Sequence, residues 1–372
     1  MRERARRPDE DGDMMRGSIA VVGAGSIGVA WSIVFARAGH PVALYEPDDD
    51  RRHQARAEVE CRLEALEGAG LLDEPSADVR RRIEPVGDLG SAVEGAVYVQ
   101  ECAPEDLEVK RGLFFLIDRV APPAAVLASS SSAIPPSKIA AGIGGAARAL
   151  VAHPGNPPYL LPIVELVPAP FTAPETVDRA ERLLAAAGMS PVRLHREVEG
   201  FVFNRLQGAV LREAYCLVRD GVVEPEDLDR VMRDGLGRRW SLLGPFETVE
   251  LNTRGGIDAH AERLGPAYAR MGAERGQHDP WTEEMVAKVS KAVQSRFPRR
   301  RWRDHVAWRD LALMSLESFR RRTPLLSGPP VEQARPRNRL RSRDEGDPSP
   351  ASGPSGGDGD VGRDGGRERC PR

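Results

Sequence analysis

Short apolar runs alternate with longer amphipathic segments in the first half of the chain, and this pattern ends near Glu199. Runs of four or five mostly apolar residues predict strands, whereas apolar positions that recur every three or four residues predict helices. The predicted strands are residues 18–22, 41–45, 97–101, 126–129, 149–152, 163–167 and 190–194. The predicted helices between them are residues 27–38, 50–68, 107–120 and 174–187. Strands that alternate with helices indicate an α/β fold built on a largely parallel sheet.

After this point almost every segment has a helical period, which predicts an all-α C-terminal domain. Its predicted helices are residues 201–220, 225–235, 282–296 and 303–321. The two ends of the chain are charged or rich in Pro, Gly and Ser, and they are too poor in apolar residues to offset the entropy of ordering them. We therefore expect a disordered arm (1–17), an α/β domain (18–198), a helical domain (199–324) and a disordered tail (325–372). Met14 or Met15 is a candidate for the true start.

The composition narrows the class of protein. The 372 residues are enough for two domains, and 53 basic residues against 56 acidic ones leave no basic patch typical of nucleic-acid binding. The four cysteines are widely separated and lack the spacing of a disulfide framework or a metal site, which favours a reducing cytoplasm. No apolar run approaches the roughly 20 residues that span a bilayer. We expect a soluble cytoplasmic protein without metal, nucleic acid or membrane partners.

A glycine motif, VVGAGSIG, follows the first predicted strand and opens the first predicted helix. In that context Gly23, Gly25 and Gly28 predict a dinucleotide site, because they permit a tight turn and let a pyrophosphate approach the helix N-terminus. Glu46 ends the second predicted strand, where a carboxylate meets the adenosine ribose. An acid there prefers NAD over NADP, since it repels the extra phosphate. The alternative is an ordinary glycine turn followed by a solvated acid.

The stretch VAHPGNPPYLLPIVELVPAP contains one histidine, His153, and one carboxylate, Glu165, among apolar residues and prolines. Two strand-like runs flank a turn rich in Pro, Gly and Asn, so the chain can return and bring the two side chains together. Such a pair suggests a catalytic base and the acid that orients it. A histidine near an apolar run is more commonly a hydrogen-bonded core or surface residue, so the pair by itself leaves both interpretations open.

Two further polar features lie near this stretch. The run ASSSSAIPPSK leaves the carboxyl end of the strand at 126–129, the edge at which α/β sheets bind ligands, so one of its hydroxyls can hold a substrate alcohol. Serine runs are also common in solvated loops and helix caps. Asn204, in GFVFNRL, is an amide at the start of an amphipathic helix, where a residue that only packs the domains together fits equally well.

Taken together, these motifs resemble the 3-hydroxyacyl-CoA dehydrogenase superfamily. The matching segments, in order, are GAGSIG, ECAPEDLEVK, the serine run, HPGNPP, IVELVP and GFVFNRL. Within the superfamily, HPGNPPYLLPIVELVP, GLGRRWSLLGPFE and PEDLEVK look most like the lambda-crystallin branch, the L-gulonate 3-dehydrogenases. The resemblance covers roughly residues 18–321. It implies a Rossmann-type NAD-binding domain, a helical domain for substrate and dimerisation, and a homodimer.

The resemblance also implies roles for individual residues. His153 matches the catalytic base, Glu165 its partner, Ser132 a hydroxyl contact and Asn204 a substrate contact, while the alignment leaves Ser131 open as the alternative to Ser132. The matching cofactor contacts are Gly23, Gly25, Ser26, Ile27, Gly28, Glu46, Glu105 and Lys110. The gulonate enzymes have aspartate where this chain has the longer glutamate of the ribose site, and a glutamate can still accept from ribose hydroxyls.

The segment GLGRRWSLLGPFE bears on the substrate. CoA-dependent relatives have a His-Pro-Met-Gly-Pro type of segment in the helical domain, so its absence points away from a CoA thioester. Arg239 is suited to bind a carboxylate, although an exposed helix-end arginine is an equal alternative. We expect NAD-dependent oxidation of the 3-hydroxyl of a small hydroxy acid, most simply L-gulonate. The alternatives are carnitine 3-dehydrogenase, 3-hydroxybutyryl-CoA dehydrogenase and a non-catalytic crystallin-like protein.

Overall fold

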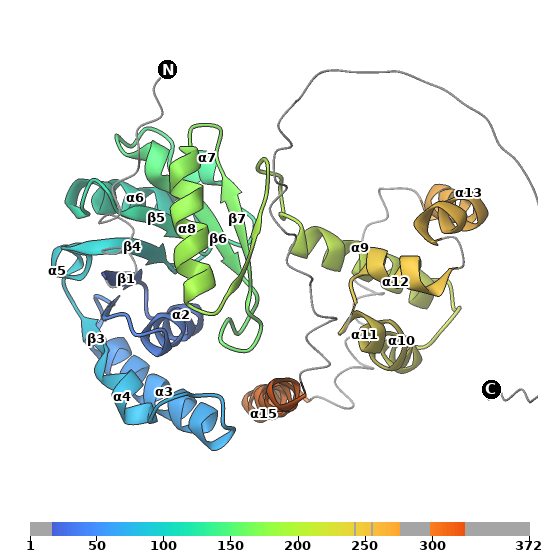
Figure 1. Ribbon diagram of the computed structural model, residues 1–372, viewed down its shortest axis with the longest axis horizontal. Coiled ribbons are helices and arrows are strands. Elements are labelled where there is room, and N and C mark those ends of the chain that lie inside the picture. The colour runs from blue at the N-terminus through green and yellow to red at the C-terminus, as the bar shows by residue number, and fades with distance from the viewer. Residues whose placement is uncertain (1–16, 242, 254–255, 276–297, 324–372) are drawn as a thin grey trace, which may run out of the picture. The chain divides into compact units, whose positions relative to one another are not determined.

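The computed structural model describes residues 17–241, 243–253, 256–275 and 298–323. An eight-stranded sheet with strand order β3-β2-β1-β4-β5-β6-β7-β8 organises the N-terminal part (Figure 1). The strands are β1 Ser18–Val22, β2 Val42–Tyr45, β3 Ile83–Val86, β4 Ala96–Glu101, β5 Val126–Ser129, β6 Ala149–Pro154, β7 Ile163–Pro168 and β8 Ser190–Arg193. Every neighbouring pair is parallel except β6 and β7, which are antiparallel.

Helices cover both faces of this sheet, as the alternation of strands and helices predicts. The helices of the N-terminal part are α2 Ser26–Arg37, α3 Asp49–Gly68, α4 Ser76–Arg81, α5 Leu89–Val93, α6 Leu107–Val120, α7 Pro136–Ile139 and α8 Pro174–Ala186, with a 3-10 turn at Ala146–Arg148. One buried cluster joins the sheet to α2, α3, α4 and α8, and a second joins it to α5, α6 and α7. Successive β1 residues alternate between them: Ile19 and Val21 belong to the first, Ala20 and Val22 to the second. A strand buried on both faces is apolar throughout, which is why its sequence reads as a continuous apolar run.

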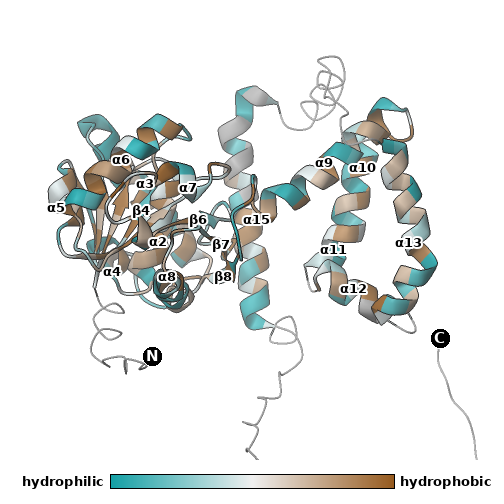
Figure 2. Cartoon of the chain, turned by 90° about the horizontal axis from the view of Figure 1, so that it is seen from above, coloured by the Kyte–Doolittle hydropathy of each residue, from teal (hydrophilic) through white to brown (hydrophobic). Residues whose placement is uncertain are grey.

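The described C-terminal part is helical, as the sequence predicts. Its elements are α9 Phe203–Arg219, α10 Pro225–Val231, a π-helical turn Met232–Leu236, α11 Gly237–Trp240, α12 Pro245–Asn252, α13 Gly256–Arg275, a 3-10 turn Arg299–Arg301 and α15 Trp302–Arg322. Hydrophobic and hydrophilic residues alternate along α9 and α13, whereas the strands are mainly hydrophobic (Figure 2). In the described residues, no helix has the length and apolar content needed to cross a bilayer.

The sequence predictions agree closely with most of the elements that pack on the core. They name no element for α7 or for residues 236–275, where the structure has α11, α12 and the 20-residue helix α13; Pro266 inside α13 interrupts its helical pattern. They also name none between residues 69 and 96, where the structure has α4, β3 and α5. Proline in the edge strand β3, IEPV, and the shortness of the two helices weaken their periodic signal. The predicted helix 225–235 ends as an α-helix at Val231 and continues as a π-helical turn. The predicted helix 282–296 and the predicted tail lie outside the described residues, as does nearly all of the predicted arm.

Candidate active site

The loop between β1 and α2 has glycines where side chains do not fit. Gly23 has φ +106°, a conformation that L side chains rarely adopt. A Cβ on Gly28 would lie 1.8 Å from the carbonyl oxygen of Gly23, so only glycine lets helix and loop pack this closely. Gly25 is the N-cap of α2, and no side chain caps the N–H groups of the first turn. These N–H groups, at the positive end of the helix dipole, form a site for an anion such as a pyrophosphate.

A cavity of about 550 Å³ lies over this loop. It is lined by Val22, Gly23, Gly25, Ser26, Ile27, Tyr45, Glu46, Pro47, Arg51, Cys102, Ala103, Pro104 and Leu113. Most of this lining is apolar, and the polar groups are concentrated at the glycine loop and after β2. The cavity therefore has an anion-binding wall, an apolar wall and one carboxylate, a combination that fits a dinucleotide.

Glu46 follows β2 at the mouth of the glycine loop. One of its oxygens accepts a hydrogen bond from the N–H of Ala24 at 3.2 Å, and the other accepts from the N–H of Asp48 at 3.3 Å. Arg51 donates to the carbonyl of Ala24 at 2.9 Å through Nε and contacts Glu58 through Nη1 at 2.7 Å. The carboxylate is thereby oriented along the cavity wall, where the sequence predicts a ribose contact.

His153 and Glu165 are direct partners in the antiparallel β6–β7 register. The imidazole Nδ1 lies 2.8 Å from Glu165 Oε2, and the two residues are 7% and 2% exposed. An ionised carboxylate only accepts, so Nδ1 carries the proton and Nε2 presents a lone pair. The two residues lie directly opposite each other on adjacent antiparallel strands, which confirms the hairpin predicted from the turn residues.

The second oxygen of Glu165 binds the start of α9. Oε1 accepts from the N–H of Val202 at 2.7 Å and of Phe203 at 3.0 Å. Burial raises the pKa of Glu165, but the hydrogen bonds from His153 and from these two N–H groups outweigh it, and the net pKa lies below the usual range. One carboxylate thus orients the imidazole and anchors the first helix of the C-terminal part.

Phe201 is a site residue that sequence reasoning missed. It is fully buried, its ring centroid lies 5.5 Å from that of His153, and its φ of 51° is unusual for a non-glycine residue. Strain of this kind persists only where surrounding packing enforces it. In the sequence, the one indication of a role for this residue is its position directly after Gly200, at the predicted domain change. Its spacing does not predict a contact with a histidine on a strand.

Asn204 and Ser132 are also brought together. The Asn204 side-chain amide donates to the backbone carbonyl of Ser132 at 2.8 Å. The two candidate serines differ: Ser131 is buried and its hydroxyl donates to Glu105 at 2.7 Å, whereas Ser132 is exposed. The position of Ser132 supports it, rather than Ser131, as the hydroxyl available to a substrate.

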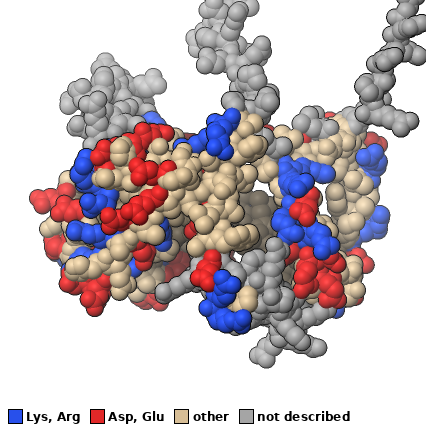
Figure 3. Space-filling model, turned by 90° about the horizontal axis from the view of Figure 1, so that it is seen from below, with Lys and Arg blue, Asp and Glu red and all other residues tan. Residues whose placement is uncertain are grey.

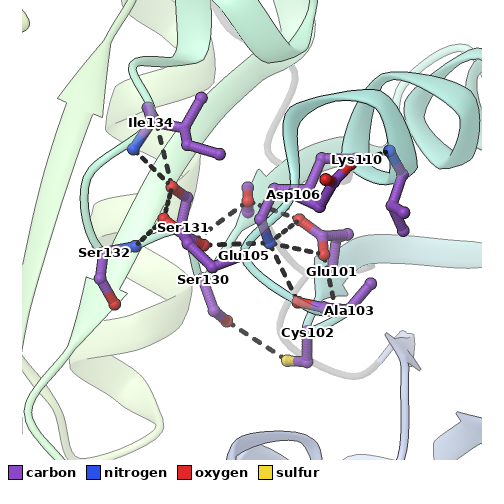
Figure 4. Close-up of polar contacts among 12 residues, drawn as sticks. Glu101, Cys102, Ala103, Glu105, Asp106, Lys110, Ser130, Ser131, Ser132 and Ile134 are labelled. Atoms are coloured by element: carbon purple, nitrogen blue, oxygen red, sulfur yellow. Dashed lines mark hydrogen bonds and ion pairs between the residues drawn. The ribbon is translucent and has the colours of Figure 1, made fainter.

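Glu105 and Lys110 both bind other groups of the protein (Figure 4). Lys110 is 1% exposed, and its ammonium lies 3.0 Å from the buried carboxylate of Glu101. Glu105 binds the serine run, and neither residue is among the side chains that line the described cavity. Their direct contact with a dinucleotide stays a prediction.

Arg239 is exposed on the short helix α11. Among the contacts of the described residues, none joins it to His153 or Asn204. Charged side chains of both signs intermingle on the face shown in Figure 3. In the described ranges there is no group of three His, Cys, Asp or Glu side chains placed to hold a metal ion.

A glycine loop at a helix N-terminus, an acid after the second strand and a buried histidine–carboxylate pair define an NAD-binding oxidoreductase of the Rossmann type. The chain belongs to the 3-hydroxyacyl-CoA dehydrogenase family. Residues 18–198 match the model of the "3-hydroxyacyl-CoA dehydrogenase, NAD binding domain", and residues 200–306 match that of the C-terminal domain.

Named relatives lie in several branches of this family. A lambda-crystallin homolog from Bos taurus is 43% identical over 319 residues, which are 84% of this chain and 98% of the relative. An L-carnitine dehydrogenase from Streptomyces griseus subsp. griseus is 36% identical over 276 residues, 74% of this chain and 79% of the relative. A crystal structure of 5-formyl-3-hydroxy-2-methylpyridine 4-carboxylic acid 5-dehydrogenase, an NAD+-dependent dismutase, has a TM-score of 0.72 and 28% identity, covering 84% of this chain and 99% of that one. NAD is therefore the cofactor, and the relatives differ in substrate.

Proposed function

We propose that this protein oxidises the 3-hydroxyl of a small hydroxy acid with NAD, that L-gulonate is the substrate, and that His153 is the general base. The observation that carries the proposal is the buried contact of 2.8 Å between His153 Nδ1 and the ionised Glu165. It leaves Nε2 as the proton acceptor. An imidazole held in one tautomer by a carboxylate is suited to remove a hydroxyl proton.

Each residue has a separate part in the reaction. His153 Nε2 takes the hydroxyl proton, while Glu165 keeps Nδ1–H in place and stabilises the imidazolium. Ser132 and Asn204 bind the substrate oxygen and orient its carbon; their linkage at 2.8 Å fixes one relative to the other. When bound, NAD supplies the hydride acceptor.

The residues that would hold NAD are those of the cavity at the start of α2. Ser26 and Ile27 line it together with Gly23 and Gly25, and Glu46 borders it where its carboxylate would accept hydrogen bonds from the ribose hydroxyls. The uncapped N–H groups of α2 suit the pyrophosphate. The carboxylate of Glu46 disfavours a 2′-phosphate by like-charge repulsion, which supports NAD over NADP.

Two features favour a small hydroxy acid over a CoA thioester. The helical domain lacks the His-Pro-Met-Gly-Pro type of segment. The chain is also more similar to a lambda-crystallin homolog, at 43% identity, than to a 3-hydroxyacyl-CoA dehydrogenase at 37%, and it is 36% identical to an L-carnitine dehydrogenase. Carnitine and gulonate are both 3-hydroxy acids, so a guanidinium that binds a carboxylate would serve either one. We propose Arg239, exposed on α11, as that carboxylate anchor. Carnitine remains the nearest competing substrate.

One experiment tests the function and its alternatives. NADH formation is measured with L-gulonate, L-carnitine, 3-hydroxybutyrate and 3-hydroxybutyryl-CoA. We expect the highest kcat/KM with L-gulonate, and we expect His153→Gln to lower kcat by on the order of 10²-fold or more while NADH binding persists. His53→Gln is the matched control, because its side chain is 77% exposed on α3. A His153→Gln variant with normal turnover contradicts the mechanism, and no activity on any substrate favours a crystallin-like, non-catalytic role.

We also propose a cytoplasmic homodimer in which the helical domain, residues 199–324, forms the interface. Its described helices and turns leave large apolar side chains exposed, which a second copy would cover. These are Leu206, Leu211, Val222, Val231, Trp240, Phe246, Ile257, Tyr268 and Met271. None of the three cysteines among the described residues forms a disulfide, which supports a reducing compartment. Sedimentation equilibrium that gives a monomer mass at micromolar concentration refutes the dimer.

A further inference from the structure

The carboxylate of Glu105 holds the backbone of the serine run. Glu105 lies in the loop after β4, and its Oε1 accepts three hydrogen bonds from the loop after β5 (Figure 4). The donors are the Ser131 hydroxyl at 2.7 Å, the N–H of Ser132 at 3.0 Å and the N–H of Ala133 at 3.0 Å. Three donors on one oxygen fix the turn that carries Ser132.

The buried ion pair of Lys110 and Glu101 lies next to this carboxylate, and the Lys110 charge stabilises its ionised form. The Lys110 ammonium lies 3.5 Å from Glu105 Oε2, 3.0 Å from Glu101 Oε1 and 3.1 Å from the carbonyl of Ala103. Burial raises the pKa of Glu105, but the bonds from the serine run and the Lys110 charge outweigh it, and the net pKa lies below the usual range. Glu105 is therefore ionised at neutral pH and accepts from all three donors.

Ser132 is held at both ends of its backbone. Its N–H binds Glu105 at 3.0 Å, and its carbonyl accepts from the Asn204 amide at 2.8 Å. In the described part of the chain no hydrogen bond engages its hydroxyl, which is exposed. Two fixed backbone groups leave only rotation about Cα–Cβ, so the hydroxyl is confined to a few directions.

We propose that Glu105 is a positioning residue for the reaction, which acts by holding Ser132 in place for the substrate. This inference rests on the proposed function, in which Ser132 contacts the substrate oxygen. Displacement of such a contact by about 1 Å lowers the rate by up to about 10²-fold.

A double-mutant cycle on the full chain tests the proposal. The variants are Glu105→Ala, Glu105→Gln, Ser132→Ala and Glu105→Ala with Ser132→Ala, and each is measured for kcat, KM, NADH affinity and melting temperature. Glu105→Ala should lower kcat/KM about 10- to 100-fold. Glu105→Gln should recover most of that loss, because its amide oxygen still accepts. If Glu105 acts through Ser132, Glu105→Ala should change the Ser132→Ala enzyme by less than about 2-fold.

Glu108→Ala is the matched control, since its carboxylate, one turn further on, is 81% exposed and pairs with Arg111 at 3.6 Å. The NADH dissociation constant is measured for every variant, so that a loss of cofactor affinity is distinguished from a loss of kcat at saturating NAD. A kcat for Glu105→Ala within about 2-fold of wild type, or losses in kcat that add in the double variant, overturns the proposal.

A measurement independent of turnover separates this proposal from the proposed function. Amide hydrogen exchange at Ser132 and Ala133, followed by NMR, should become faster by about tenfold or more in Glu105→Ala and stay unchanged in Glu108→Ala. A wild-type protein that oxidises no hydroxy acid disproves the proposed function, and the exchange rates then decide whether Glu105 holds the serine run. Unchanged exchange in Glu105→Ala overturns the proposal.

Discussion

Replacement of Glu165 by glutamine tests the histidine–carboxylate pair without changing the size of the side chain. Glu165 accepts from His153 Nδ1 at 2.8 Å through one oxygen, and from the N–H groups of Val202 and Phe203 at 2.7 and 3.0 Å through the other. A glutamine has one oxygen and one NH2 group. Because both N–H groups of α9 donate, the amide oxygen must turn toward them, and its NH2 then faces the imidazole.

This orientation reverses the tautomer of His153. The NH2 donates to Nδ1, so the imidazole proton moves to Nε2, which can no longer accept the hydroxyl proton. Loss of the charge-assisted hydrogen bond alone removes about 1.5–3 kcal/mol, or about 10- to 200-fold in rate. A wrong tautomer raises the loss to on the order of 10⁴-fold. We therefore expect Glu165→Gln to lower kcat by between about 10² and 10⁴.

The assay is initial-rate NADH formation at saturating substrate, with NADH affinity measured alongside. Affinity should stay within about 2-fold of wild type, because Glu165 is not among the residues that line the cofactor cavity. Glu74→Gln is the control, since Glu74 is also a hydrogen-bonded carboxylate, which accepts from Arg82 at 2.5 Å, but lies in another part of the chain. A kcat for Glu165→Gln within about threefold of wild type would refute the tautomer argument.

The same carboxylate makes stability depend on pH. The folded pKa of Glu165 lies below its usual range, because hydrogen bonds outweigh the effect of burial. Its stabilising effect is therefore fully present above the unfolded pKa of about 4.3 and is lost as the pH falls through the folded pKa. In urea denaturation, the difference in unfolding free energy between wild type and Glu165→Gln should shrink as the pH falls from about 7 to about 3. A difference that does not change with pH contradicts this assignment.

Three further predictions follow from contacts elsewhere in the N-terminal part. Lys110→Met should lower the free energy of unfolding by about 3–5 kcal/mol in urea denaturation, because Glu101 is then left as an unpaired buried charge. Adding Glu101→Gln to this variant should restore part of the lost stability. Gly28→Ala should weaken NADH binding at least about tenfold by fluorescence titration, since its Cβ would lie 1.8 Å from the Gly23 carbonyl; normal affinity would show that the loop can adjust. Glu46→Arg should shift the kcat/KM ratio from NAD toward NADP by about 10²-fold, and an unchanged ratio would place the ribose elsewhere.

The sequence alone determines those features that depend on neighbours close along the chain. The glycine loop can be predicted because the turn, the helix start and the close packing all involve residues near Gly23 and Gly28. The contact between His153 and Glu165 can be predicted for the same reason. Two strand-like runs and a proline-rich turn lie within a short stretch, and a hairpin brings residues on its two strands together. The short elements α4, β3 and α5 were missed because a segment of so few residues has too weak a hydrophobic periodicity.

Only the tertiary structure decides the contacts between distant segments. Glu165 binds the start of α9 across 37 positions of sequence, and Asn204 reaches Ser132 across 72. The burial of Lys110 against Glu101 also depends on how α6 packs on the sheet, which no local pattern encodes. Periodicity specifies which face of an element is buried, but hydrogen-bond partners depend on the packing of whole elements in three dimensions. For this reason the sequence predicts the histidine–carboxylate pair, and the structure shows which contacts hold the pair and the serine run in place.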